Sequence, residues 1–384
     1  MHVLWTPSWY PSPEFPLNGH FFEEAIEVLQ EHGHEVGVYY LNPKSFWQQG
    51  NRQLQIERDK RVIRQTVRTV PRGILPGDYT LIKLHAIEAA RAYAKHWGKP
   101  DIIHAQSVFP GILTAKVMAA YWDIPFGITE HRGSTLDANE NYPRFQAIKR
   151  AVQDADFRLA VSSNFAKELG GKYGAEFGVG TLPVPQRFYD HPLHKRVPGK
   201  TRFVHISSLD RWKRVEETIV GLKDLLNEGY DASLDIIGGS EHRCDEVRAF
   251  TQKNGVANAV NVLGQVSRDE LPSVLSTKDV LVLVSSSETA GMVFAEAQAL
   301  GIPVIASASL GGAHMVQEET GILVPIDDHD ALVDAMRDFA SGRVIKEPEE
   351  VRRVAYERFS GDAYAKLHTD VYEQALCAYE EMES

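Results

Sequence analysis

The sequence predicts an α/β protein with two doubly wound parallel-sheet domains that face a central cleft. Apolar, strand-like runs alternate with helical patterns along the whole chain, which is typical of parallel sheets covered by helices on both faces. The length of 384 residues allows two or more domains, each with its own core. Prolines and mixed charges gather in residues 182–199, as in a linker between two similar halves.

In the first half, apolar runs predict strands and amphipathic repeats predict the helices between them. The strands are expected at Val3–Trp5, Val36–Leu41, Ile102–Ala105, Phe126–Thr129 and Arg158–Val161. The helices are expected at Phe21–His32, Tyr79–Trp97 and Gly111–Tyr121. The first of these helices has Gly33 as its stop signal.

The second half repeats the pattern. Its strands are expected at Phe203–Ser207, Ser233–Ile237, Val260–Leu263, Val280–Val284 and Val304–Ala306. We therefore expect one Rossmann-like domain over residues 1–187 and another over residues 188–361. A last segment, about residues 362–384, has no strand after it and is expected to be helical.

Composition favours a cytoplasmic protein. The two cysteines, Cys244 and Cys377, give no disulfide framework. The N-terminus lacks a basic start followed by an apolar core, and no apolar run approaches the ~20 residues of a membrane span. Residues 1–190 carry 21 Lys and Arg against 20 Asp and Glu, whereas residues 191–384 carry 20 against 32. The excess of acidic residues in the second half argues against a general nucleic-acid-binding protein.

A basic cluster interrupts the first half between residues 52 and 72. Its members are Arg52, Arg58, Lys60, Arg61, Arg64, Arg68 and Arg72. One interpretation is peripheral contact with an anionic membrane or a lipid diphosphate, because each basic residue near such a surface contributes about 1 kcal/mol. The alternative is a solvated loop or strand face.

The most informative stretch runs from Ser285 to Val304. It predicts a buried strand, a loop of small residues that carries Glu288, and a helix that carries Glu296 eight positions later. Gly291 permits close backbone approach, and the following helix start offers unpaired N–H groups and a positive dipole end, so a phosphate would fit there. The two carboxylates could then accept hydrogen bonds from a sugar and a ribose. The alternative is an ordinary strand–turn–helix unit with two solvated glutamates.

The spacing of Glu288 and Glu296, with Gly291 between them and Gly301-Ile302-Pro303 behind, resembles the signature of retaining glycosyltransferase family 4. This resemblance covers nearly the whole chain and implies a GT-B fold and a nucleotide-sugar donor. The opening of the chain, through Asn18-Gly19, is similar to that of bacterial polysaccharide-type members. In relatives of this fold, the terminal helix crosses back onto the first domain. The resemblance also implies that residues 1–187 form the acceptor-side domain and that residues 188–361 form the domain that binds the nucleotide-sugar donor.

The resemblance also implies a cationic site for the donor diphosphate after strand Phe203–Ser207. Lys213 matches the family lysine, but Ser208 stands in the place of the family arginine, and Arg211 or Arg214 is a candidate substitute. The alternative for both arginines is a solvated helix start.

Other site residues come from the resemblance in the same way. His131 matches a histidine that touches the donor sugar, and Gly19 matches a glycine close to the phosphates. Val266 lies in a loop that contacts the base, although a plain turn is an equal alternative, and Met292 and Val293 open the helix after Gly291. The segment Leu310–His314 matches another turn of the family, in which His314 stands where the family has a glutamate, and the resemblance assigns His314 no role.

The resemblance implies a reaction without metal. Asp154-Ala155-Asp156 is an Asp-x-Asp triplet, and such triplets hold the ion in metal-dependent transferases, but here it ends a helix. Front-face displacement at the sugar is the mechanism implied, with His131, Lys213 and Glu288 as catalytic residues. Nucleotide-binding residues would be Gly19, Arg211, Val266, Gly291, Met292, Val293 and Glu296.

The expected activity is transfer of a hexose or N-acetylhexosamine, with UDP favoured over GDP, to a glycan or lipid-linked acceptor. A nucleotide-sugar 2-epimerase of the same fold is one alternative, and a non-catalytic sugar-nucleotide sensor is another because Ser208 and His314 depart from the motif. An NAD-dependent oxidoreductase is disfavoured, since no Gly-x-Gly-x-x-Gly follows the first strand.

Overall fold

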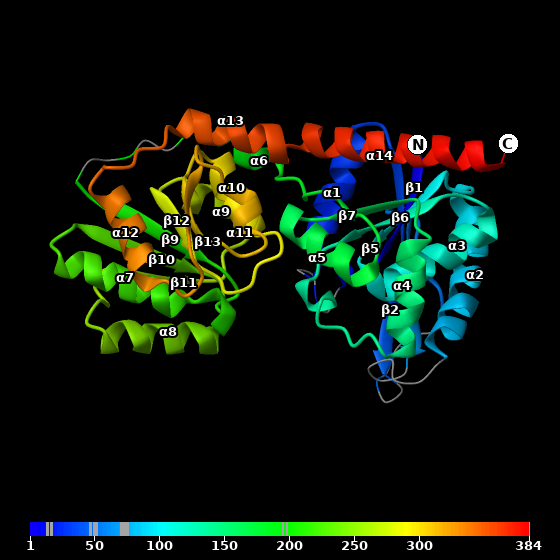
Figure 1. Cartoon of the computed structure of the whole chain (residues 1–384), viewed down its shortest axis with the longest axis horizontal. Coiled ribbons are helices and arrows are strands. Elements are labelled where there is room, and N and C mark those ends of the chain that lie inside the picture. The colour runs from blue at the N-terminus through cyan, green and yellow to red at the C-terminus, as the bar shows by residue number, and fades with distance from the viewer. Residues whose placement is uncertain are drawn as a thin grey trace. The chain divides into compact units, whose positions relative to one another are not determined.

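The structure is a computed structural model that describes residues 1–12, 15, 18–45, 48, 53–69, 77–193, 196 and 199–383. The chain divides into two compact units (Figure 1). The first unit comprises Met1–Pro183 and Tyr364–Ser384, and the second comprises Val184–Ala363. The sequence-based boundary at residues 187 and 188 lies a few residues later.

The first unit is built on an eight-stranded sheet in the order β3-β4-β2-β1-β5-β6-β7-β8. Its strands are β1 (His2–Pro7), β2 (Glu35–Ser45), β3 (Gln55–Glu57), β4 (Val62–Thr69), β5 (Ile102–Gln106), β6 (Phe126–Glu130), β7 (Phe157–Ala160) and β8 (Gly178–Val179). All five strands predicted for this half are present. The prediction omitted β3, β4 and β8.

The parallel sheet that was predicted is present, and one edge differs from it, where β3 pairs antiparallel with β4. Only a short turn separates the two strands, and so short a connection closes a hairpin, whereas a parallel pair needs a long crossover. The pairing Ile56–Ile63 places the basic cluster in this hairpin, with Arg61, Arg64 and Arg68 on or beside β4. Arg52 and Arg72 lie outside the described residues.

Helices pack against this sheet and bury its apolar residues. They are α1 (His20–Glu31), α2 (Asp78–Trp97), α3 (Leu113–Trp122), α4 (Pro143–Gln153) and α5 (Ser163–Tyr173), together with the C-terminal helix α14 (Gly361–Glu383). Hydrogen bonds tie α14 to the sheet, because Tyr372 bonds to the fully buried His104 of β5 (2.7 Å) and Thr369 bonds to His34 (2.8 Å).

The second unit has a six-stranded parallel sheet in the order β11-β10-β9-β12-β13-β14. Its strands are β9 (Thr201–Ile206), β10 (Ala232–Ile237), β11 (Val260–Gly264), β12 (Val280–Leu283), β13 (Val304–Ser307) and β14 (Gly321–Val324). In sequence order within the unit this arrangement is 3-2-1-4-5-6, the order of a doubly wound dinucleotide-binding sheet. The five predicted strands are present, and β14 was not predicted.

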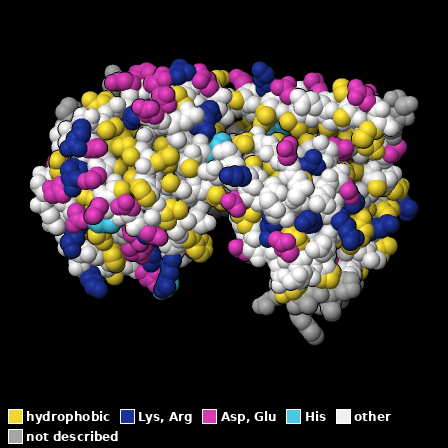
Figure 2. Space-filling model, in the orientation of Figure 1, with side chains coloured by type: hydrophobic (Ala, Val, Ile, Leu, Met, Phe, Trp, Pro, Cys, Tyr) yellow, Lys and Arg dark blue, Asp and Glu magenta, His cyan; other side chains and the backbone are white. Residues whose placement is uncertain are grey.

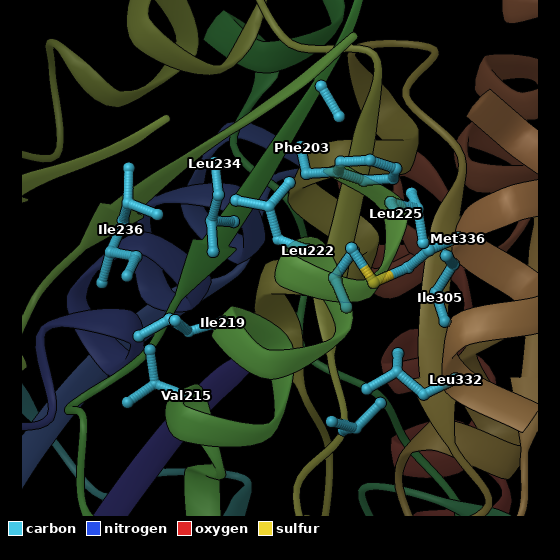
Figure 3. Packing of buried hydrophobic residues seen from close by; sticks show 14 of the residues in the cluster. Phe203, Val215, Ile219, Leu222, Leu225, Leu234, Ile236, Ile305, Leu332 and Met336 are labelled. Atoms are coloured by element: carbon cyan, nitrogen blue, oxygen red, sulfur yellow. The ribbon is translucent and has the colours of Figure 1, made fainter. Parts of the chain in front are cut away.

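Two apolar clusters cover the two faces of this sheet. Its helices are α6 (Gln186–Tyr189), α7 (Val215–Asn227), α8 (Glu241–Lys253), α9 (Leu271–Leu275), α10 (Met292–Ala299), α11 (Gly312–Met315), α12 (His329–Ala340) and α13 (Pro348–Phe359). On one face, Leu222 of α7 and Met336 of α12 pack with Phe203 of β9 (Figure 3). On the other, Val204 of β9 packs with Phe294 of α10. Neighbouring residues of β9 thus serve opposite layers, as a sheet covered on both faces requires.

The surface of the second unit carries the acidic excess of its sequence. Figure 2 shows Asp and Glu side chains along α13, where Glu349 and Glu357 are exposed. Within the described part of the chain, no helix combines the length and the apolar character that a bilayer span demands.

Each sheet has one point where the winding direction reverses. In the second unit this point lies between β9 and β12, and in the first unit between β1 and β5. Ligands of doubly wound sheets bind beyond the carboxyl ends of the strands at such points. The loops after these four strands are therefore the first places to look for a site.

Candidate functional site

In the second unit, the loops after β9 and β12 bring a cation and a carboxylate together. Lys213 ends a short helical turn that follows β9, and Glu288 lies in the loop after β12. The Lys213 Nζ and Glu288 Oε2 atoms are 2.5 Å apart. Both side chains are largely buried, with exposures of 17% and 14%. Water screens such a pair weakly, so each group sets the position of the other.

Backbone geometry holds the loop of Lys213 in place. The Ser286 amide donates to the Trp212 carbonyl at 2.8 Å, which joins the two loops directly. Arg243 of α8 donates from Nε to the Leu209 carbonyl at 2.7 Å, at a residue with a left-handed backbone (φ 59°). These contacts support the turn that presents Lys213.

A buried histidine lies beneath the same loop. His205 Nε2 is 2.8 Å from the Ser207 hydroxyl, which also accepts from the Leu209 amide. Burial, with a smaller contribution from the charge of Lys213, lowers the pKa of His205 to about 3. The imidazole is therefore neutral near pH 7 and fixes the start of the loop without adding charge.

Gly291 begins α10 with a left-handed backbone (φ 73°). A Cβ at this position would lie 2.6 Å from the Phe294 ring and 3.1 Å from Glu288 Cγ, so a side chain would crowd the carboxylate. The Gly311 amide fixes the same loop by donating to the Glu288 carbonyl at 2.7 Å. The N–H groups of the first helical turn thus lie beside Lys213 and Glu288, and together with the cation they can bind an anion.

Glu296 lies on α10 with only 2% exposure and accepts from Arg268 Nη1 at 2.5 Å. Arg268 was not predicted as a site residue, although it follows Val266 by two residues in the loop that was expected to contact the base. An arginine in such a loop was a signal that a cation could reach the second carboxylate. Each carboxylate of the motif therefore pairs with a cation from another loop. Glu288 pairs with Lys213 after β9, and Glu296 pairs with Arg268 after β11.

The apolar residues expected to contact the nucleotide lie together. Val266, Met292 and Val293 are partly buried, and all three pack against the cluster that contains Phe294.

The two candidate substitutes for the missing arginine differ. Arg214 is engaged by Glu217 at 3.3 Å and by Asp327 at 2.5 Å. Arg211 is exposed and lies two residues before Lys213. Ser208 itself donates to Asp210 at 2.6 Å. Of the two, Arg211 is the one whose charge is not used by an ion pair among the described residues.

His314 lies in α11, beside the loop of Glu288. Burial, with the charge of Arg358 second, lowers the pKa of His314 to about 4, so its ring is neutral near pH 7. Its backbone carbonyl accepts from Arg358 at 2.6 Å. The replacement of the family glutamate therefore removes a negative charge from this turn.

His131 belongs to the first unit, where it follows β6. Its Nε2 lies 2.8 Å from Gln106 Oε1, and its ring packs edge-on against Phe22 and Trp9. Burial is the main reason that the pKa of His131 is lowered to about 3, and nearby positive charge adds to it. A neutral imidazole can donate or accept a hydrogen bond with a sugar hydroxyl.

Gly19 lies beside the same aromatic residues and begins α1 with a left-handed backbone (φ 84°). A Cβ there would lie 2.9 Å from the Trp9 ring and 3.1 Å from Phe22. Trp9 and Phe22 thus connect Gly19 with His131. The other predicted site residues belong to the second unit.

Glu130, the residue before His131, was not predicted from the sequence. Its carboxylate is completely buried and accepts hydrogen bonds from the Ser107 hydroxyl and from the amides of Val108, His131 and Arg132. Burial raises the pKa of Glu130, and these hydrogen bonds oppose that change. The Glu130 carboxylate thereby holds the loop after β5 and the loop after β6 together. Nothing in its sequence context distinguished it from a solvated glutamate.

The acidic triplet of the first half has structural partners. Asp154 pairs with Lys116, and Asp156 accepts from the Phe126 amide at 2.8 Å at the start of β6. Among the residues that the structure describes, no cluster of three or more His, Cys, Asp or Glu side chains is arranged to hold a metal ion.

The basic cluster is partly neutralised in the structure. Arg61 pairs with Glu35 at 2.6 Å, and Arg64 pairs with Glu57 at 2.5 Å. Arg64 also donates to the Pro11 carbonyl at 2.6 Å. Contact of residues 52–72 with an anionic membrane stays a prediction, with fewer unpaired charges than the sequence suggested.

Two family models match the chain. One, described as "Glycosyltransferase Family 4", matches residues 19–178, and the other, described as "Glycosyl transferases group 1", matches residues 190–358. Together they cover every strand of the two sheets except β1 and the last residue of β8.

Relatives match over most of the chain. A Bacillus subtilis protein named for teichuronic acid biosynthesis, the glycosyltransferase TuaC, is 28% identical over 90% of this chain and 91% of its own length. The D-inositol 3-phosphate glycosyltransferase of Xylanimonas cellulosilytica is 27% identical over 78% of each chain.

Solved structures share the fold at lower identity. The lipopolysaccharide outer core galactosyltransferase WaaB has a TM-score of 0.72 at 17% identity and covers 97% of this chain and 99% of its own. Anabaena HepE in complex with UDP has a TM-score of 0.71 at 14% identity, with 97% and 100% covered. These likenesses show a GT-B glycosyltransferase fold.

Proposed function

Because the chain belongs to glycosyltransferase family 4, and is therefore a glycosyltransferase enzyme, we propose that it transfers a hexose or N-acetylhexosamine from a nucleoside diphosphate sugar with retention of configuration. UDP is the favoured nucleotide. The proposed acceptor is a glycan or a lipid-linked sugar in surface polysaccharide or glycoconjugate synthesis, as the name of the Bacillus subtilis relative suggests.

The observation that carries the proposal is the pairing of Lys213 with Glu288 beside the N-terminus of α10. A leaving diphosphate needs positive charge, which Lys213 and the helix start supply. A sugar needs hydrogen-bond acceptors for its hydroxyl groups, which Glu288 supplies. Anabaena HepE, which has the same fold, holds UDP, and this supports a nucleoside diphosphate at the site.

The other proposed roles follow from position. Glu296 accepts from the ribose hydroxyls, and Val266, Met292 and Val293 provide apolar surface for the nucleoside. Arg211 adds charge near the diphosphate. In the first unit, His131 contacts the donor sugar and Gly19 allows close approach of a phosphate.

The proposed reaction is a front-face displacement. The bond between the anomeric carbon and the diphosphate oxygen breaks, and a bond from the acceptor oxygen forms on the same face. The proton of the acceptor hydroxyl passes to the departing phosphate oxygen. Lys213 and the α10 N-terminus stabilise the charge that develops on the diphosphate, so the reaction is proposed to need no metal.

A thermal-shift and hydrolysis screen with UDP-, GDP- and ADP-glucose and their N-acetylglucosamine counterparts tests the donor, with and without EDTA. We expect a selective shift and slow release of one nucleoside diphosphate, unaffected by EDTA. An absence of shift and of release with every donor would contradict the proposal. Loss of release in EDTA, restored by magnesium, would overturn the metal-free reaction.

A further inference from the structure

The first unit contains a cavity of about 420 Å³ at its own winding reversal. Ser8 follows β1 and Ser107 follows β5, and both line the cavity. The Ser8 amide donates to the Gln106 carbonyl at 2.9 Å and the Ser8 hydroxyl donates to the Ser107 carbonyl at 3.1 Å, so the two loops form one floor. The size is within the range of ordinary ligand pockets.

Aromatic side chains form the interior. Phe145 and Tyr173 are almost fully buried and stack with ring centroids 5.5 Å apart. Phe109 and Tyr142 are partly exposed at the lining. Such faces take up the apolar side of a sugar ring or an alkyl chain.

The outer wall of the cavity is held in place by Lys172 of α5. Its ammonium donates to the carbonyls of Leu136 (2.7 Å) and Ala138 (3.0 Å). The ammonium also lies 5.2 Å from the centre of the Phe145 ring. The wall therefore exists before a ligand binds, and little ordering would be needed on binding.

Two arginines line this cavity, and they differ in how their charge is used. Arg144 makes two bonds to Asp78, at 2.6 and 2.8 Å, and stacks on Phe109 at 4.0 Å. Arg132 is exposed and stacks on Trp9, with Cζ 3.8 Å from the ring centre. Its backbone amide is bound by Glu130, but its guanidinium makes no hydrogen bond or ion pair with any residue that the structure describes.

A stacked guanidinium with unused donors is suited to a planar or tetrahedral oxyanion, which it can bind with two parallel hydrogen bonds. The hydrogen bond from the Arg132 amide to Glu130 fixes the backbone, and the stacking on Trp9 limits the positions of the side chain, so less entropy is lost on binding. Asp137 is the one carboxylate of the lining, and it is exposed, so solvent screens its repulsion.

We propose that this cavity binds the acceptor and that the acceptor carries an oxyanion, either a phosphate or a carboxylate, which Arg132 holds. A ring or alkyl portion of the acceptor lies against Phe109 and Tyr142. The proposal rests on the proposed glycosyltransferase reaction, whose donor is assigned to other residues. A soluble sugar phosphate or uronic acid and a lipid-linked phosphate share this chemistry.

Binding of four probes to the full chain, measured by isothermal titration calorimetry, tests the proposal. The probes are phenyl glucoside, which is neutral, phenyl glucuronide, phenyl phosphate and dodecyl phosphate. We expect the anionic probes to bind at least about tenfold more tightly than phenyl glucoside. Tighter binding of dodecyl phosphate than of phenyl phosphate would assign the site to a lipid-linked acceptor, and the reverse order to a soluble one.

Variants identify the residue responsible. Arg132→Gln should abolish the advantage of the anionic probes, Arg132→Lys should keep part of it, and Arg150→Gln, an exposed arginine on α4 outside the lining, should keep all of it. Ala138→Trp places a large side chain at an exposed lining position and should weaken all four probes. Circular dichroism checks that each variant is folded.

Equal affinity for neutral and anionic probes, no binding of any probe at millimolar concentration, or an unchanged preference in Arg132→Gln would overturn the proposal. Donor hydrolysis by the parent protein is measured separately. If that hydrolysis is absent while the anionic probes bind through Arg132, the glycosyltransferase proposal fails and the oxyanion site stands. If hydrolysis is present without an anion preference, the site proposal fails alone.

Discussion

The ammonium of Lys213 lies 2.5 Å from the carboxylate of Glu288, so the two groups proposed to hold opposite parts of a nucleotide sugar neutralise each other in the protein without a ligand. Both are mostly buried, and an unpaired charge of either sign would be costly there. The pair therefore keeps each side chain in position until a donor supplies a diphosphate for the lysine and hydroxyl groups for the glutamate.

The first prediction concerns this pair. Lys213→Ala and Glu288→Ala should each lower turnover by at least about a hundredfold, because each removes one preorganised stabilising group. Steady-state release of the nucleoside diphosphate measures the effect. Lys223→Ala is a suitable control, because Lys223 is also partly buried in the second unit but contacts Asn254 instead. Turnover within about threefold of the parent in both site variants would refute the assignment.

The second prediction concerns Arg268, which pairs with the buried Glu296. Arg268→Ala should lower the free energy of unfolding by about 1–3 kcal/mol, because the buried Glu296 carboxylate loses the charge of Arg268. The estimate is below the usual range for buried pairs, since Arg268 is 32% exposed and water can replace part of the interaction.

Urea denaturation measures that loss, and a second arginine provides the comparison. Arg248 pairs with Asp245 on the surface, where both are well exposed, so Arg248→Ala should change stability by less than about 1 kcal/mol. In a Glu296→Gln background the cost of Arg268→Ala should shrink. An undiminished cost would show that Arg268 acts through packing and not through the charge of Glu296.

The third prediction concerns the protonation of His131. Its pKa is lowered to about 3, chiefly by burial, so the ring should stay neutral throughout the range in which an enzyme near neutral pH works. Nitrogen-15 chemical shifts of the imidazole, assigned by their loss in His131→Gln, should not change between pH 8 and pH 5. A titration of these signals near pH 6.5 would contradict the structure.

Much of the fold was accessible from the sequence because parallel strands buried on both faces leave continuous apolar runs. The strand Val280–Val284 is of this kind, and it is present as β12. The hairpin of β3 and β4 was missed because Val62–Thr69 mixes apolar with basic residues at a sheet edge. Its arginines drew attention as a charge cluster, and only the structure shows Arg61 and Arg64 in ion pairs.

The candidate site was predictable where it is contiguous in sequence. Gly291 and Glu296 belong to one strand–loop–helix unit whose spacing carries the signal. Arg268 and Arg132 were not singled out, because their importance depends on contacts with residues distant in the chain or on the walls of a cavity. A single sequence does not show which arginine of a loop meets a buried carboxylate and which keeps its donors unused.

The fourth prediction concerns acid stability. The pKa of His205 and of His131 is lowered to about 3, and that of His368 to about 4, mainly by burial. In the unfolded chain a histidine titrates at about 6.5. Below that pH the unfolded state binds protons that the folded state does not, so the free energy of unfolding falls as pH decreases from about 6.5 toward 3.

In this pH range, each such histidine makes the free energy of unfolding fall by up to about 1.4 kcal/mol for each pH unit of acidification. Urea denaturation at pH 7.5, 6.0 and 5.0 measures the total slope. His205→Asn removes one titrating group and leaves a side chain that can bond to the Ser207 hydroxyl, so its slope should be smaller than that of the parent. A stability that is flat or rises from pH 7.5 to pH 5.0 would contradict the burial of these rings.

The last prediction uses two glycines of the second unit with the same left-handed backbone and different surroundings. Gly238 (φ 104°) follows β10, and a Cβ there would lie 2.0 Å from the Ser207 carbonyl oxygen, at the start of the loop of Lys213. Gly229 (φ 91°) follows α7 and has open space around that position. Both alanine variants suffer the backbone strain of about 1–3 kcal/mol, but only Gly238→Ala must also move the Ser207 backbone. Gly238→Ala should therefore unfold at a lower urea concentration than Gly229→Ala and should lose donor turnover in native buffer, whereas Gly229→Ala should keep it. Equal turnover in the two folded variants would show that the position of Ser207 does not govern Lys213.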